Sequence, residues 1–183
     1  MMPHFIRVAG VLMGIGFFSA FFLSLMADYA YPLIEKNREA RLRKSIYTVL
    51  PETKTYHLVN NENNIYKGLN KDSIGTGYAF VAEGGGYQGI IKIMIGIDIL
   101  KKKISGLKIL ENVETPGLGS KISSDKFQNQ FIGKLLNKPI EYILNKNPQA
   151  PFEIQAITGA TISTRAVVNI VNKRIQEVKS IPE

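Results

Sequence analysis

Cysteine and tryptophan are absent from this chain of 183 residues, and histidine occurs only as His4 and His57. The absence of cysteine excludes disulfides, thiolate zinc sites, iron–sulfur clusters and haem attachment through thioethers. Two histidines cannot build a multi-histidine metal site, and no Gly-x-Ser-x-Gly motif offers a hydrolase nucleophile. Any redox or group-transfer chemistry therefore requires a bound organic cofactor.

A run of uncharged residues extends from Val8 to Ala27, with only Ser19 and Ser24 interrupting its apolar surface. A helix of this length spans about 30 Å, the thickness of the hydrocarbon core of a bilayer. A cleaved signal peptide is the alternative, but its apolar region is shorter and ends in a small-x-small site. The sequence therefore predicts an uncleaved transmembrane anchor over residues 1–27.

Charges flanking the anchor predict its orientation. His4 and Arg7 lie on the N-terminal side, whereas Asp28 opens the other side. By the positive-inside rule, the N-terminus is cytoplasmic and everything after residue 28 is extracytoplasmic. Gly10 and Gly14 form a GxxxG pair on which a partner helix can pack closely.

The chain has a formal net charge of +8, and 45% of its residues are hydrophobic. This hydrophobic content excludes a disordered chain. A basic surface can attract nucleic acid, but a domain exported on a membrane anchor seldom meets it. We therefore expect no nucleic-acid partner, and assign the charge to a solvated surface, an acidic partner or anionic membrane lipid.

Residues 28–74 are predicted to form a juxtamembrane helix and connecting strands. Pro32 fits the first turn of a new helix, and Pro51 ends it. Apolar residues recur between them at helical spacing: Leu42, Ile46, Val49 and Leu50. The basic run from Arg38 to Lys44 is interpreted as a solvated face or a headgroup contact.

Residues 75–183 show strand patterns followed by helical ones. Strands are predicted at 77–82, 90–97, 104–110 and 152–157, with turns at 84–86 and 101–103. A helical pattern covers 123–131, and the last helix follows residue 161, with one apolar face made of Ile162, Ala166, Ile170, Val171, Ile175 and Val178. The sum is a small mixed α+β domain behind a single transmembrane helix.

The first candidate motif is TGAT at residues 158–161, where a strand passes through a turn into a helix. Free N–H groups at a helix start attract anions, and Gly159 and Ala160 leave room for a phosphate. Thr158, Thr161 and Ser163 place hydroxyls at the same spot. Ordinary helix capping by these hydroxyls is the alternative.

The second candidate motif is ETPGLG at residues 114–119. Glycines on both sides of Leu118 predict a loop with an apolar side chain at its tip, stiffened by Pro116. Such a loop can lie against a flat aromatic ring, with Glu114 or Thr115 making polar contacts to the ring edge. A plain surface turn is the alternative.

Together and in this order, the two motifs resemble the FMN-binding domain of membrane redox complexes. Tyr87-x-Gly89 and the strand after it resemble the lead-in of the same domain, so the resemblance covers residues 75–178. The short length and single anchor are most similar to the FMN-binding G subunit of the Rnf (Rsx) ion-translocating electron-transport complex. The C subunit of the Na⁺-translocating NADH:quinone reductase is a related but typically longer protein.

This resemblance implies which residues hold the cofactor. In that family a separate flavin transferase uses FAD to attach FMN, through a phosphoester, to the final Thr of a D-x-x-[ST]-G-A-[ST] motif. The implied attachment residue is Thr161, and the acidic first position is Gln155 here. The remaining implied contacts are the turn residues Thr158, Gly159 and Ala160 and the loop residues Glu114, Thr115, Gly117 and Leu118, which border the flavin ring.

The resemblance also implies a function and a location. The chain is expected to be a redox subunit without independent catalytic activity, single-pass in a prokaryotic cytoplasmic (inner) membrane. Its partners are the other membrane subunits of an Rnf-type complex, which move Na⁺ or H⁺, and a flavin transferase during maturation. Two alternatives stay open. One is a structural or sensory anchor that binds FMN loosely or not at all, and the other is a free-standing extracytoplasmic flavoprotein.

Overall fold

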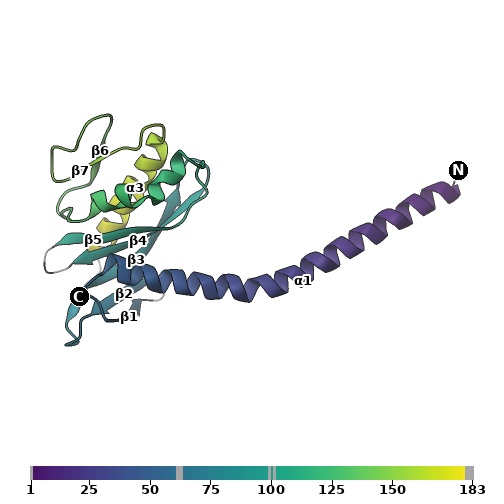
Figure 1. Cartoon of the computed structure of the whole chain (residues 1–183), viewed down its shortest axis with the longest axis horizontal. Coiled ribbons are helices and arrows are strands. Elements are labelled where there is room, and N and C mark those ends of the chain that lie inside the picture. Colours follow the sequence, from purple (N-terminus) through teal and green to yellow (C-terminus); the bar gives the residue numbers. More distant parts are fainter. Residues whose placement is uncertain (1, 61–63, 99, 101, 180–183) are drawn as a thin grey trace. The chain divides into compact units, whose positions relative to one another are not determined.

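The computed structural model describes residues 2–60, 64–98, 100 and 102–179 of the chain. The chain divides into two compact units, one ending at Arg41 and the other beginning at Leu42. The mixed α+β architecture expected from the sequence is confirmed, with a long N-terminal helix followed by strands and a final helix (Figure 1).

Helix α1 covers Met2–Val49 and contains the predicted anchor. Its most apolar window has a mean hydropathy of 2.1, and none of that window is buried. The helix is thus long and apolar enough to cross a membrane. The prediction that a new helix starts at Pro32 is wrong, because α1 continues through this residue. Proline removes one helical hydrogen bond, and the neighbouring turns here retain the helix.

The second unit is built on a five-stranded antiparallel sheet in the order β1-β2-β3-β4-β5 (Figure 1). Each strand pairs with the next along the chain, so the sheet is a meander. The strands are β1 (Thr55–Asn60), β2 (Ile65–Leu69), β3 (Gly75–Gly85), β4 (Ile90–Asp98) and β5 (Lys103–Glu111).

Strand β4 is buried on both faces, which explains its nearly unbroken apolar sequence. Alternate side chains of a strand point to opposite faces. The isoleucines at 91, 93, 95 and 97 therefore enter the larger core cluster together with helix α3 (Thr161–Lys179), whereas Met94 enters a smaller cluster with Ile46 and Val49 of α1. The sheet is a layer between α3 and the C-terminal end of α1.

The C-terminal end of α1 lies directly on the sheet. A Cβ atom added to Gly96 would come within 2.3 Å of the Val49 carbonyl oxygen, so β4 needs glycine there. The Ser105 hydroxyl donates a 2.7 Å hydrogen bond to the same carbonyl. Carbonyls in the last turn of a helix lack helical partners, and this bond from β5 supplies one.

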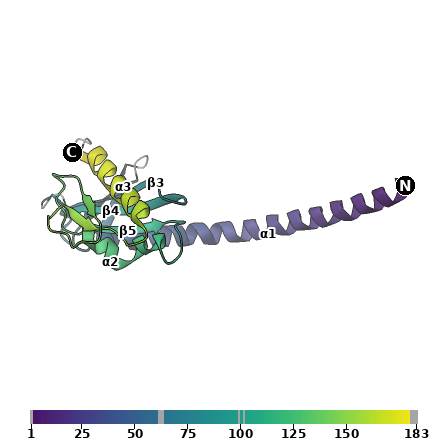
Figure 2. The same ribbon diagram turned by 90° about the horizontal axis from the view of Figure 1, so that it is seen from above.

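The opposite face is covered by α3, which crosses the sheet at β3 (Figures 1 and 2). Short elements fill the space between β5 and α3, where Phe127 and Phe131 are buried. They are the 3-10 helices η1 (Gly119–Ser123) and η2 (Asn129–Phe131), helix α2 (Asp125–Gln128) and the parallel pair β6 (Glu141–Ile143) and β7 (Glu153–Gln155).

Several predicted boundaries shift. The turn expected at 84–86 is wrong, because β3 continues to Gly85 and the turn closes with a hydrogen bond from Gly86 N–H to Gly89 O. Gly84 instead allows Ile170 of α3 to approach the sheet closely. The helical pattern at 123–131 is split among η1, α2 and η2. Of the predicted 101–103 turn, residue 101 lies outside the described residues, and Lys103 already belongs to β5.

Candidate functional site

The ETPGLG motif forms a compact loop immediately after β5. Its backbone folds on itself, with the N–H groups of Leu118 and Ser120 both donating to the Thr115 carbonyl, at 3.2 and 3.1 Å. The Ser120 hydroxyl accepts a 3.0 Å bond from Gly117 N–H. Leu118 remains 46% exposed at the tip, as the sequence predicted.

The TGAT motif forms a tight turn between β7 and α3. Ala160 N–H donates to the Ile157 carbonyl at 2.9 Å, and Gly159 has φ +79°, a conformation that favours glycine. Helix α3 then begins at Thr161. Within the described chain no hydrogen bond occupies the backbone N–H groups of Thr161, Ile162 and Ser163, since the first helical bond runs from Thr164 N–H to Ala160 O. These three donors carry the positive end of the helix dipole.

The two motifs, far apart in sequence, lie against each other. A Cβ atom at Gly159 would be 3.3 Å from Cδ2 of Leu118. The tip of the ETPGLG loop therefore packs against the TGAT turn. Between them is a cavity of about 570 Å³, which we call the loop cavity. It is lined by Tyr87, Thr115, Leu118, Gly119, Gly159, Ala160, Thr161, Ile162 and Ser163.

The hydroxyl groups around the loop cavity differ in how they are used. Thr164 is fully buried, donates to Ala160 O and accepts from Ile157 N–H. Ser163 is 3% exposed and donates to a carboxylate oxygen of Glu114. Thr158 is exposed and does not line the cavity. Thr161 is half-buried and lines the cavity, and none of the hydrogen bonds among the described residues uses its hydroxyl.

Glu114 is buried behind the cavity wall and is 4% exposed. Its Oε1 atom accepts hydrogen bonds from the backbone N–H groups of Tyr87 at 2.8 Å and Gln88 at 3.1 Å. Its Oε2 atom accepts from the Ser163 hydroxyl. One carboxylate therefore connects the β3–β4 turn, the ETPGLG loop and the start of α3.

The structure thus places most of the predicted site residues in one location. Thr115, Leu118, Gly159, Ala160, Thr161 and Ser163 line the loop cavity, and Glu114 supports it from behind. Thr158 and Gly117 are exposed and do not line it. The lining residues Tyr87, Gly119 and Ile162 were not among the predicted site residues. Helical periodicity had assigned Ile162 to the buried face of α3, yet it is 45% exposed.

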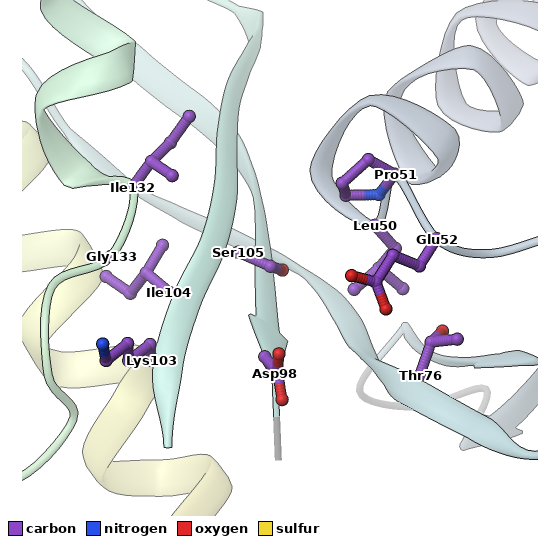
Figure 3. A pocket seen from close by; sticks show the side chains of 10 residues that line it. All are labelled: Leu50, Pro51, Glu52, Thr76, Asp98, Lys103, Ile104, Ser105, Ile132 and Gly133. Carbon is purple, nitrogen blue, oxygen red and sulfur yellow. The ribbon is translucent and has the colours of Figure 1, made fainter. Parts of the chain in front are cut away.

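A second cavity of about 210 Å³ lies at the opposite ends of β4 and β5, and we call it the α1 cavity (Figure 3). Its lining comes from the residues that follow α1, from the adjacent strand ends and from the loop after η2: Leu50, Pro51, Glu52, Thr76, Asp98, Lys103, Ile104, Ser105, Ile132 and Gly133. Its hydroxyls are already paired, since Ser105 donates to Val49 O and Thr76 shares a 2.6 Å bond with Thr53.

The described part of the chain contains no set of side chains that could bind a metal ion. Among residues 2–60, 64–98, 100 and 102–179, no group of three or more His, Asp or Glu side chains is gathered closely enough to hold an ion. The chemistry that the loop cavity offers consists of a hydroxyl, helix-terminal N–H donors and exposed apolar walls. This combination suits an organic ligand with an anionic group.

Comparison with known proteins identifies the domain that contains the cavity. Residues 86–176 match the family model described as FMN-binding domain. The crystal structure of Shewanella oneidensis NqrC has the same fold, with a TM-score of 0.58 and 16% sequence identity over 74% of this chain and 73% of that one.

Two curated relatives are similar to part of the chain. The chain is 34% identical to the G subunit of the ion-translocating oxidoreductase complex of Methanosarcina acetivorans, over 63% of this chain and 58% of that protein. It is 36% identical to the G subunit of the Na⁺-translocating ferredoxin:NAD⁺ oxidoreductase complex of Acetobacterium woodii, over 52% of this chain and 45% of that protein. The chain spans about half the length of these relatives. The resemblance carried by the two motifs is confirmed: residues 86–176 match the FMN-binding domain family, and the chain is similar to the G subunits of ion-translocating oxidoreductase complexes.

Proposed function

We propose that this chain is a membrane-anchored electron-transfer subunit that carries FMN on Thr161 through a phosphoester. The observation that carries the proposal is the state of the hydroxyls in the TGAT region. Thr161 lines the loop cavity and its hydroxyl is uncommitted among the described residues, whereas those of Ser163 and Thr164 are engaged. The family match to an FMN-binding domain supplies the ligand class.

The attachment replaces the phosphoanhydride bond of FAD with one phosphoester bond. The Thr161 oxygen forms a bond to the FMN phosphorus of FAD, the pyrophosphate bond breaks, AMP leaves and the hydroxyl proton is lost. A separate flavin transferase would catalyse this step during maturation. The free N–H groups at the start of α3 would then face the phosphate, a placement worth about 0.3–1 kcal/mol.

The apolar wall of the cavity provides the place for the flavin ring. Tyr87, Leu118 and Ile162 are 62%, 46% and 45% exposed, which is high for large apolar side chains gathered at one cavity. A flat ring lying on them would cover this surface. The bound flavin supplies the electron-accepting chemistry, and the side chains orient it and exclude water.

The electron partners are proposed to be the other membrane subunits of an Rnf-type complex, whose electron flow moves Na⁺ or H⁺. The names of the relatives support this assignment, since both are subunits of ion-translocating oxidoreductase complexes. Helix α1 would anchor the chain in membrane lipid, with the N-terminus cytoplasmic and the flavin domain outside. No independent catalytic activity is proposed.

Mass spectrometry of the full-length chain, produced with a flavin transferase, tests the attachment. We expect the intact mass to exceed the sequence mass by one FMN less water, and the addition to map to the peptide containing Thr161. Thr161→Ala should lose the addition and the in-gel flavin fluorescence. Thr48→Ala, which removes an exposed hydroxyl from α1, is the matched control and should retain both. An unmodified wild-type chain would contradict the proposal.

One departure from the family motif favours a second candidate, in which FMN is held without a covalent bond. Gln155 stands at the acidic position of the motif, and its backbone is paired with Gln130 through bonds of 2.7 and 3.2 Å. A transferase that reads this position would modify the chain slowly. In that case the flavin is released on denaturation, and Gln155→Asp increases the covalently labelled fraction.

A further inference from the structure

We propose that Glu114 is a positioning residue of the loop cavity, which acts through Ser163 and the Tyr87–Gln88 turn and does not touch the ligand. This inference rests on the proposed flavin site for its consequences, although the contacts that carry it lie within the chain. It changes the role implied by the family resemblance, in which Glu114 borders the flavin ring.

The two carboxylate oxygens of Glu114 are both engaged inside the protein. Oε1 accepts from two successive backbone N–H groups, at 2.8 and 3.1 Å, and Oε2 accepts from the Ser163 hydroxyl. Glu114 is 4% exposed and is absent from the lining of the cavity. A ligand in the cavity therefore meets Tyr87 and Ser163, which Glu114 holds, and not Glu114 itself.

Two glycines enclose this carboxylate. A Cβ atom at Gly86 would lie 2.3 Å from Oε1 of Glu114, and one at Gly119 would lie 2.9 Å from Oε2. The second would also lie 2.8 Å from the Ser163 hydroxyl oxygen. The surrounding backbone thus leaves room for a carboxylate of this length and for no additional side chain. Such enclosure suits a residue whose task is to hold its neighbours in one geometry.

The charge of Glu114 is stabilised by its surroundings. A buried carboxylate is costly unless it receives hydrogen bonds, and this one receives three. Ser163 is also in the first turn of α3, where the helix dipole favours a negative charge. These three hydrogen bonds therefore offset the cost of burying the Glu114 carboxylate.

The hydrogen bond to Glu114 determines whether the Ser163 hydroxyl can act as a donor or as an acceptor toward the cavity. An ionised carboxylate only accepts hydrogen bonds, so the Ser163 hydroxyl must be the donor and its remaining lone pairs face elsewhere. Ser163 is then an acceptor toward the ligand, suited to an N–H or hydroxyl group such as those of a flavin ring or ribityl chain. Recognition of the phosphate falls to the N–H groups at the start of α3.

Amide hydrogen exchange in the full-length chain without flavin tests the contacts. In Glu114→Ala the exchange of Tyr87 and Gln88 should accelerate by about tenfold or more, since bonds to a charged acceptor are lost. Glu114→Gln should give a smaller acceleration, because its amide oxygen still accepts both bonds. Glu111→Gln removes an exposed carboxylate at the end of β5 and should leave both amides unchanged. Wild-type exchange of both amides in Glu114→Gln and Glu114→Ala would overturn the inference.

A double-mutant cycle on the flavin-loaded chain tests the consequence. The midpoint potential should become more positive in Glu114→Gln, because a buried negative charge that opposes the added electrons is removed. The shift in Glu114→Gln/Ser163→Ala should be smaller than the sum of the single shifts, since the two residues act as one unit. Additive shifts would overturn the inference. A wild-type chain without flavin refutes the proposed function instead, and the exchange experiment still decides the role of Glu114.

Discussion

The loop cavity and the α1 cavity lie at opposite ends of β4 and β5, and they differ in whether their polar groups are free. In the α1 cavity the hydroxyls of Thr76 and Ser105 are paired within the protein. In the loop cavity the Thr161 hydroxyl and the first N–H groups of α3 have no partner among the described residues. What distinguishes a candidate binding site is the presence of hydrogen-bond donors that remain available to a ligand. The volume of a cavity does not by itself indicate a site.

The largest expected effect is a loss of stability from the core that lies between the loop cavity and the α1 cavity. Ile95 lies in the middle of β4 with no exposed surface and belongs to the larger core cluster. Ile95→Ala should destabilise the domain by about 2–5 kcal/mol, since it removes buried methylene groups and leaves a cavity. Chemical unfolding of the full-length chain in detergent measures this change. An effect below about 1 kcal/mol would show that the two ends do not depend on a common core.

The next largest effect is expected at two matched glycines, one in each cavity, whose substitution should distinguish the roles of the two cavities. Gly159 in the loop cavity and Gly133 in the α1 cavity both have φ +79°. Alanine at either position should cost about 1–2 kcal/mol of stability, because a Cβ is strained in this conformation. Only Gly159→Ala should also reduce the flavin content, which absorbance of the purified chain reports. Equal flavin loss in Gly133→Ala would contradict the assignment of the site to the loop cavity.

A smaller effect is expected from the paired hydroxyl of the α1 cavity. Ser105→Ala removes the donor to the Val49 carbonyl at the end of α1. The expected loss of stability is about 1 kcal/mol, the usual net value of one hydrogen bond. Thermal unfolding should detect it, while flavin content stays at the wild-type level. A fall in flavin content here would indicate that the two ends are coupled.

The smallest stability effect is expected at two exposed apolar side chains. Leu118 is 46% exposed at the loop cavity, and Ile132 is 51% exposed at the α1 cavity. Alanine at either position should change stability by no more than about 0.5 kcal/mol. Leu118→Ala should shift the absorbance and fluorescence of the bound flavin, since Leu118 is proposed to lie against the ring. Ile132→Ala should leave both spectra unchanged, and a reversed pattern would place the ring elsewhere.

Most of the fold was predictable from local patterns. The strongly strand-forming run at 90–97 predicted β4, and the apolar face after residue 161 predicted α3. The helix start predicted at Pro32 was wrong because proline can be tolerated inside a helix. The turn predicted at 84–86 was wrong because Gly84 lies in a strand, where it allows close packing against Ile170. Local sequence does not distinguish a glycine that forms a turn from one that allows another element to pack closely against the backbone.

The candidate site was predictable in its members but not in their roles. The two motifs named Thr161, Ser163 and Glu114 together, and the structure brings them to one cavity or its wall. Tyr87 was named only in the lead-in of the domain and not as a site residue, since its place at the cavity depends on the turn between β3 and β4. Its bond to Glu114 joins residues 27 positions apart, which no spacing rule anticipates.

The sequence alone determined the apolar helix, the order of strands and the presence of hydroxyls at a helix start, because each follows from side-chain polarity and backbone preference over a few neighbouring residues. Only the tertiary structure decided which hydroxyl is engaged and which is free. Ser163 is engaged by a carboxylate 49 positions away. Such a bond exists only once the sheet and α3 have packed, since packing sets the distance between groups that the chain itself leaves far apart.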